Sequence, residues 1–140
     1  MKHGNEAIVL ITTKGRYALR VMIDLAQQDT DTFIPLKDIA ERQGVSKKYL
    51  EVIVKDLVKG NLLSAASGKG GGYKLNKPAA QYSVGEILGA TEGSLAIVAC
   101  VAADAEECPR ADGCHTLPMW REFDTMVHDF FERKKLTDLL

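Results

Sequence analysis

Three cysteines stand close together in the second half of the chain, and their thiols are the side chains best suited to chemistry. Cys100, Cys108 and Cys114 fall within 15 residues and are separated by seven and then five residues. Zinc sites usually contain a Cys pair about two to four residues apart, which neither gap provides. An odd number of cysteines also argues against structural disulfides. Three interpretations stay open: ligands of an iron–sulfur cluster, redox thiols, or small core side chains.

A cluster held by three thiolates normally needs a fourth ligand. His115 follows Cys114 directly, and we take it as the candidate. No sequence argument selects it over the acidic side chains of the same stretch, which are Asp104, Glu106, Glu107 and Asp112.

The first half of the chain has the pattern of a small helical domain. Apolar residues at helical spacing predict helices over residues 13–28, 35–43 and 47–59, where Gly44 ends the second and Ser46 caps the third. Two helices joined by a short turn that contains Gly predict a helix-turn-helix. An ordinary helical hairpin would also show a solvated outer face like that of the third helix, which carries Lys47, Lys48, Glu51, Lys55 and Lys59.

The segment after the third helix predicts a β-hairpin. Residues 62–66 and 73–75 read as short strands, and the glycine-rich residues 67–72 between them predict a tight turn. Three helices followed by a hairpin form the winged-helix layout. Glycines let the tip approach a sugar–phosphate backbone closely, and Lys69 at the tip would meet a phosphate. The glycine run lacks the spacing of a phosphate-binding NTPase loop or a dinucleotide fingerprint.

The distribution of charge and of apolar residues narrows the range of possible functions. Residues 1–78 hold 13 Lys and Arg against 8 Asp and Glu, whereas residues 79–140 hold 5 against 11. A basic half joined to an acidic half suggests an anion-binding module attached to another unit, although surface charge also segregates by chance. No apolar run approaches the roughly 18–20 residues that span a bilayer, and the N-terminus lacks a secretory pattern. We therefore expect a cytoplasmic protein without a membrane partner.

The C-terminal half predicts a short helix over residues 84–90, capped by Ser83, and a long helix over residues 117–134. We interpret the long helix as a dimerisation helix, because helix-turn-helix proteins usually read paired half-sites as dimers. The alternative is a helix folded back on its own core. Bulky apolar residues recur along it at coiled-coil-like steps of three and four: Trp120, Phe123, Val127 and Phe130.

The expected fold is mainly α with a small β-hairpin wing, namely a winged helix-turn-helix plus a C-terminal dimerisation helix. The chain should divide into an N-terminal tail (1–9), a winged-helix domain (10–78), a short helix with a cysteine-bearing loop (79–116), and the dimerisation helix with the C-terminal segment (117–140).

Four ordered motifs resemble the Rrf2 family of winged helix-turn-helix transcription regulators: residues 13–20 (TKGRYALR), 45–51 (VSKKYLE), 70–75 (GGGYKL) and 108–120. The resemblance runs from about residue 10 to residue 140. It implies a homodimeric, non-enzymatic repressor or activator that binds double-stranded operator DNA.

The resemblance also implies roles for individual residues. The third helix would enter the major groove, and the wing would touch the minor groove or the backbone. Glu51 would help to read bases, since a carboxylate can accept a hydrogen bond from cytosine N4. Phosphate contacts are implied for Lys14 and Arg16. Further DNA contacts are implied for Lys47, Lys48, Tyr49 and Lys55.

In cluster-bearing members of the family, three cysteines match Cys100, Cys108 and Cys114, so the implied cofactor is an iron–sulfur cluster, [2Fe-2S] in preference to [4Fe-4S]. Loss or change of the cluster would alter operator affinity. Such members place a ligating His where this chain has Leu117, two residues away from the register of His115. The alternative is a cluster-free regulator of the same fold that responds through redox thiols or a partner protein.

Overall fold

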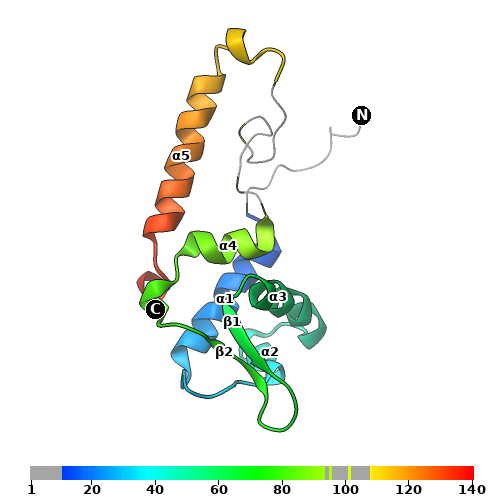
Figure 1. Cartoon of the computed structure of the whole chain (residues 1–140). Helices are drawn as coiled ribbons and strands as arrows, with labels where there is room; N and C mark the ends of the chain where they lie inside the picture. The colour runs from blue at the N-terminus through cyan, green and yellow to red at the C-terminus, as the bar shows by residue number, and fades with distance from the viewer. Residues whose placement is uncertain (1–10, 94, 96–100, 102–107) are drawn as a thin grey trace.

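The computed structural model describes residues 11–93, 95, 101 and 108–140. Figure 1 shows a helical body with a hairpin at its edge, with α4 (Val84–Glu92) crossing one end of the body and α5 (Leu117–Arg133) standing away from it. A mainly helical chain with one antiparallel hairpin confirms the expected fold class. No helix among the described residues is long and apolar enough to cross a bilayer. The principal elements are α1 (Thr13–Gln27), α2 (Leu36–Gln43), α3 (Lys47–Lys59), β1 (Leu63–Ala66), β2 (Gly72–Leu75), α4 (Val84–Glu92) and α5 (Leu117–Arg133).

Local signals set the boundaries of the first three helices. The Thr12 hydroxyl accepts from the Gly15 N–H, and the Ser46 hydroxyl accepts from the Tyr49 N–H. Gly44 adopts the left-handed conformation (φ 65°) that closes α2. Pro35 was expected to open α2 as its first residue, but its ψ of 141° makes it the N-cap instead. Apolar side chains at helical spacing form the core between these helices, among them Val21, Met22, Leu25, Ile39, Leu50, Ile53 and Leu57.

Polar contacts fix the angle of the helix-turn-helix against α1. The Asp24 carboxylate is only 2% exposed, and it accepts from Arg42 Nη2 at 2.7 Å and from Gln43 Nε2 at 3.0 Å. Arg20, one turn earlier on α1, donates to the Gln43 carbonyl at 2.8 Å. A buried carboxylate that accepts several hydrogen bonds tolerates little displacement of its partners. The C-terminal end of α2 is therefore held firmly against α1.

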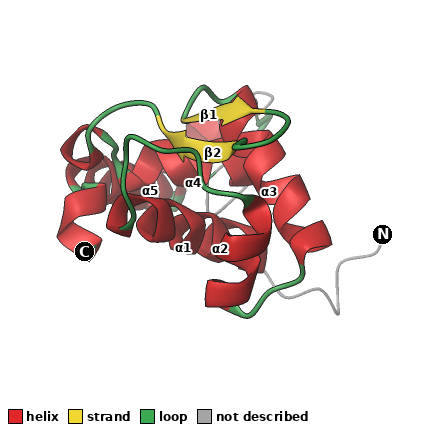
Figure 2. Cartoon of the chain, turned by 90° about the horizontal axis from the view of Figure 1, so that it is seen from below, coloured by secondary structure: helices red, strands yellow, loops and turns green. Residues whose placement is uncertain are grey.

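The hairpin pairs β1 with β2, from Leu63 opposite Leu75 to Ala66 opposite Gly72, and lies along one edge of the helical body (Figure 2). Its second strand also pairs with Ile34, whose N–H and C=O both bond to Tyr73 at 2.9 Å. Gly72 permits this approach, since its φ is 145° and a Cβ would collide with the Ile34 carbonyl.

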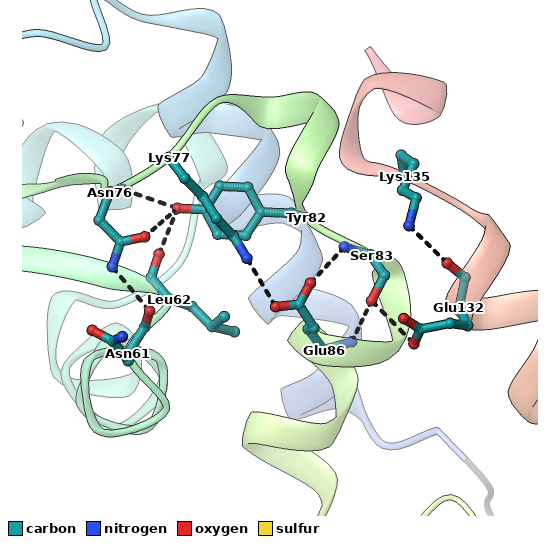
Figure 3. A network of polar contacts seen from close by, with 9 residues as sticks. All are labelled: Asn61, Leu62, Asn76, Lys77, Tyr82, Ser83, Glu86, Glu132 and Lys135. Atoms are coloured by element: carbon teal, nitrogen blue, oxygen red, sulfur yellow. Dashed lines mark hydrogen bonds and ion pairs between the residues drawn. The ribbon is translucent and has the colours of Figure 1, made fainter.

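Tyr82 and Ser83 join the base of the hairpin to the C-terminal end of α5 (Figure 3). The Tyr82 hydroxyl lies 2.8 Å from the Leu62 carbonyl and accepts from the Asn76 N–H at 2.9 Å. Ser83 and Glu86 form a reciprocal capping box at the start of α4. Backbone bonds continue to the far side of the junction, from Leu136 N–H to the Tyr82 carbonyl and from Val84 N–H to the Lys134 carbonyl. One end of α5 is thus fixed to the wing base.

Candidate nucleic-acid interface and cysteine loop

The outer face of α3 is exposed and basic, as the sequence predicts. The five charged residues expected there, Lys47, Lys48, Glu51, Lys55 and Lys59, are all exposed. Within the described part of the chain, none of the four lysines forms a salt bridge. Unpaired lysines on one helix face can bind phosphates without first breaking an internal ion pair.

Tyr49 has a packing contact that the sequence did not indicate. Its half-buried ring meets Tyr17 of α1 edge to face, with centroids 5.8 Å apart and planes at 86°. The Arg20 guanidinium lies 4.6 Å from the centroid of the same Tyr17 ring. This stack positions the first turn of α3 against α1. The DNA contact expected of Tyr49 stays a prediction.

Lys14 and Arg16 lie at the start of α1 in different surroundings. Lys14 forms an ion pair with Asp56 of α3, so it ties the two helices together. Arg16 is exposed and donates to the Thr13 hydroxyl at 3.1 Å. The phosphate contacts expected of both stay predictions, and Lys14 would have to share its charge with Asp56.

The wing presents Lys69 at its tip. Gly68 and Gly70, which flank it, have φ angles of 83° and 79°, a region that L side chains rarely adopt. Lys69 is exposed and forms no salt bridge among the residues that the structure describes. The tip therefore offers one cation on a narrow, small-residue turn.

The described part of the cysteine loop, residues 108–116, lies at the end of α5 away from the body (Figure 1). Cys108 is exposed, and its sulfur accepts from the Arg110 N–H at 3.4 Å. The sulfur of Cys114 lies 3.5 Å from the Thr116 hydroxyl. Hydrogen bonds from the Thr116 side chain, and then from the backbone N–H groups of Thr116 and Leu117, lower the pKa of the Cys114 thiol.

These contacts fit ligation by thiolate, because N–H and O–H donors aimed at sulfur favour its charged form and orient it. His115 is exposed beside Cys114. Cys100, Asp104, Glu106 and Glu107 lie outside the described residues. In the described ranges no group of three His, Cys, Asp or Glu comes together. The expected four-residue ligand set stays a prediction.

Apolar side chains of α5 face outward in the single chain. The most exposed are Met119, Phe123, Met126 and Phe130, at 51, 38, 60 and 47%. Of the four expected dimer residues, Phe123 and Phe130 are thus exposed, whereas Trp120 and Val127 are half-buried. These four exposed residues are spaced by four, three and four positions. The membership of Met119 in this apolar stripe was missed in the sequence analysis. A hollow of about 230 Å³ lies along this face.

The C-terminal end of α4 is bonded to the start of α1. Glu92, the last residue of α4, accepts from the Thr12 N–H at 3.0 Å and from the Thr12 hydroxyl at 2.6 Å. Its carboxylate fills the space where a Cβ on Gly15 would stand. Because Lys14 of the same turn pairs with Asp56, the end of α4 is linked through α1 to α3.

Comparison with known proteins decides the family. The Rrf2 family, described as iron-dependent transcriptional regulators, matches residues 11–140. The chain belongs to the Rrf2 family. It is 37% identical over 130 residues to the HTH-type transcriptional regulator IscR of Pectobacterium atrosepticum, covering 93% of this chain and 78% of that protein. The same protein of Yersinia enterocolitica matches at the same identity and coverage.

Solved structures support this assignment. CymR, the global cysteine regulator of B. subtilis, superposes on this Rrf2 chain with a TM-score of 0.73 at 32% identity, covering 92% of this chain and 94% of CymR. IscR of T. potens superposes with a TM-score of 0.68 at 27% identity, covering 92 and 84%. The resemblance seen in the sequence is confirmed, and the chain is a DNA-binding transcriptional regulator rather than an enzyme.

Proposed function

We propose that this Rrf2 regulator binds operator DNA as a homodimer in the cytoplasm, and that a cysteine-ligated iron–sulfur cluster adjusts its affinity. One arrangement supports the proposal. The basic outer face of α3 and the wing lie on the body, and the loop with Cys108 and Cys114 lies at the far end of α5 (Figure 1). A hydrogen bond and an ion pair join the end of α4, which precedes the cysteine segment in the chain, through α1 to α3.

For DNA, α3 would lie in the major groove. Its exposed lysines would contact phosphates on either side, and Glu51 would accept a hydrogen bond from a base edge. The wing would place Lys69 against the backbone beside this groove. The Tyr17–Tyr49 stack and the Asp24 contacts would keep α3 in place, so that little ordering is needed on binding.

For assembly, the exposed face of α5 would pack on the same face of a second copy. The apolar side chains on this face stay exposed in the single chain, and a second chain could cover them. Their alternating spacing of three and four residues suits packing against another helix. The interface would include Trp120, Phe123, Val127 and Phe130, together with Met119 and Met126.

For sensing, Cys100, Cys108 and Cys114 would hold the cluster, with His115 as the candidate fourth ligand and [2Fe-2S] as the favoured type. When bound, such a cluster supplies a centre that responds to redox state, nitric oxide or iron–sulfur supply. The Arg110 N–H and the Thr116 hydroxyl would orient the two described sulfurs. The Glu92–Thr12 and Lys14–Asp56 contacts would carry a change in the loop to α3.

The cluster can be tested directly by counting iron and acid-labile sulfide in protein purified without oxygen, beside its absorption spectrum. We expect coloured protein with stoichiometric iron and sulfide, and a Cys108→Ala variant that keeps its helical circular dichroism but loses both. His128→Ala is the matched control, because His128 is exposed in the middle of α5. A Cys108→Ala protein with full iron would remove Cys108 from the ligand set.

A cluster-free regulator is the second candidate, and the likeness to CymR, the global cysteine regulator, fits it in part. In that case Cys108 and Cys114, which are both free thiols, would respond to oxidants or the chain would respond to a partner protein. Colourless, iron-free protein that still binds its operator, with an affinity that changes on thiol oxidation, would decide for this candidate.

A further inference from the structure

Val52 lies at the centre of the outer face of α3. The face opposite to it packs into the core through Leu50, Ile53, Val54 and Leu57. At 100° per residue, Val52 points almost directly away from that buried face, whereas Glu51 lies on its flank. Half of its side chain, 50%, is exposed.

Three lysines surround this valine. Lys48 stands four residues before it, Lys55 three residues after it and Lys59 seven residues after it, all on the same stripe and all exposed. A β-branched side chain gains nothing there from the core, and it is a weaker helix former than its charged neighbours. One exposed valine alone would need no explanation. Its place inside the stripe of lysines proposed to bind phosphates, beside the Glu51 proposed to read a base, points to a ligand.

The geometry of a major groove explains this arrangement. Long lysine side chains reach outward to the phosphates that border the groove, while a short side chain at the middle of the helix faces the base edges. The thymine C5-methyl is the apolar group that base pairs present there. Valine has no hydrogen-bonding group, so it can discriminate among bases only through such a methyl.

We propose that Val52 contacts the C5-methyl group of one thymine in each operator half-site, next to the base that Glu51 reads. This inference rests on the operator binding proposed above. It adds a specificity-determining residue: thymine would be favoured at that position over cytosine, which lacks the methyl, through an apolar contact.

The test uses an operator selected from random-sequence DNA by the full-length wild-type protein. Each thymine is then replaced singly by deoxyuridine, which differs only in lacking the methyl, and affinity is measured by fluorescence anisotropy. At one thymine per half-site the wild type should bind about fourfold more weakly, the factor expected for one buried methyl. Val52→Ala, which lacks the two methyl groups that would reach the base, should bring the ratio between the thymine and uracil operators close to one there, and respond like the wild type at every other thymine. The variant should fold, since the site is exposed and alanine favours helix.

Lys59→Ala is the matched control on the same stripe. It should weaken binding to both operators alike and keep the fourfold ratio, because a phosphate contact carries no information on the methyl. A wild type insensitive to uracil at every thymine would overturn the inference, and so would a Val52→Ala protein that keeps the wild-type ratio. A selection that yields no preferred sequence would instead overturn the proposed operator binding, and the proposed contact between Val52 and thymine would fall with it.

Discussion

Replacing Tyr82 by Phe should loosen the junction between the wing and α5. The Tyr82 side chain is fully buried, and burial raises the pKa of its phenol, so the hydroxyl stays protonated. It lies 2.8 Å from the carbonyl of the buried Leu62 and 3.0 Å from Asn76 Oδ1, and it accepts from the Asn76 N–H. The substitution removes all of these contacts but keeps the ring that fills the space.

The loss of stability depends on which hydrogen-bond partners of the Tyr82 hydroxyl can bond to water instead. Asn76 is exposed, so its N–H and side chain can be solvated after the change, whereas the Leu62 carbonyl belongs to a residue only 5% exposed. One buried acceptor left without a partner costs about 1–3 kcal/mol. No cavity is created, so no further packing loss should be added. We therefore expect the free energy of unfolding to fall by roughly 2 kcal/mol.

Urea unfolding followed by circular dichroism, at matched protein concentration, measures this change. Tyr73→Phe is the control, since the Tyr73 hydroxyl forms no hydrogen bond among the residues that the structure describes. It should change the unfolding free energy by less than about 0.5 kcal/mol. Equal effects of the two substitutions, or no effect of Tyr82→Phe, would refute the role given to the hydroxyl.

Four further predictions concern pH, assembly, DNA and coupling. Burial raises the pKa of the Glu86 carboxyl, but hydrogen bonds from Ser83 and Lys77 outweigh this and lower the pKa below its ordinary value of 4.5. In urea titrations above pH 4.5 the wild type should therefore be more stable than Glu86→Gln. This difference should vanish as the pH falls through the lowered pKa. Met126→Glu should weaken the proposed homodimer and raise its dissociation constant at least about tenfold in sedimentation experiments, because the substitution would place an unpaired carboxylate in the proposed interface. Glu51→Ala should change base preference at one position by roughly 1–3 kcal/mol, whereas Lys69→Ala should weaken all sequences alike and lower the salt slope by about one unit. Glu92→Ala should reduce the coupling between cluster state and operator affinity by roughly 1 kcal/mol, and unchanged coupling would exclude the Thr12 contact as its route.

Features that depend on neighbouring residues could be predicted from the sequence. Ser46 and Ser83 cap helices, and Gly44 ends one, because each acts on backbone groups within a few positions. The winged-helix order followed from these local signals, and so did the basic face of α3. The ends of elements differ by a residue or two; α4, for example, continues to Glu92 rather than ending at residue 90.

Contacts between distant residues could not be predicted in this way. The sequence implies a phosphate contact for Lys14 but gives no sign of its ion pair with Asp56, which lies beside it only after α1 and α3 pack together. Tyr49 meets Tyr17 for the same reason. On α5, periodicity identified an apolar face, but the residues left outermost depend on how the helix sits against the body. Met126 is consequently more exposed than Val127.

The central claim is that the state of the cysteine loop controls the affinity of α3 for DNA. The most direct test is one titration of a selected operator with oxygen-free protein, before and after iron is removed with a chelator, with iron counted in each sample. We predict stoichiometric iron in the first sample and a change in operator affinity of at least about fivefold in the second, the lower end of typical allosteric coupling. The same affinity in both samples, with iron present in the first and absent from the second, would contradict the claim.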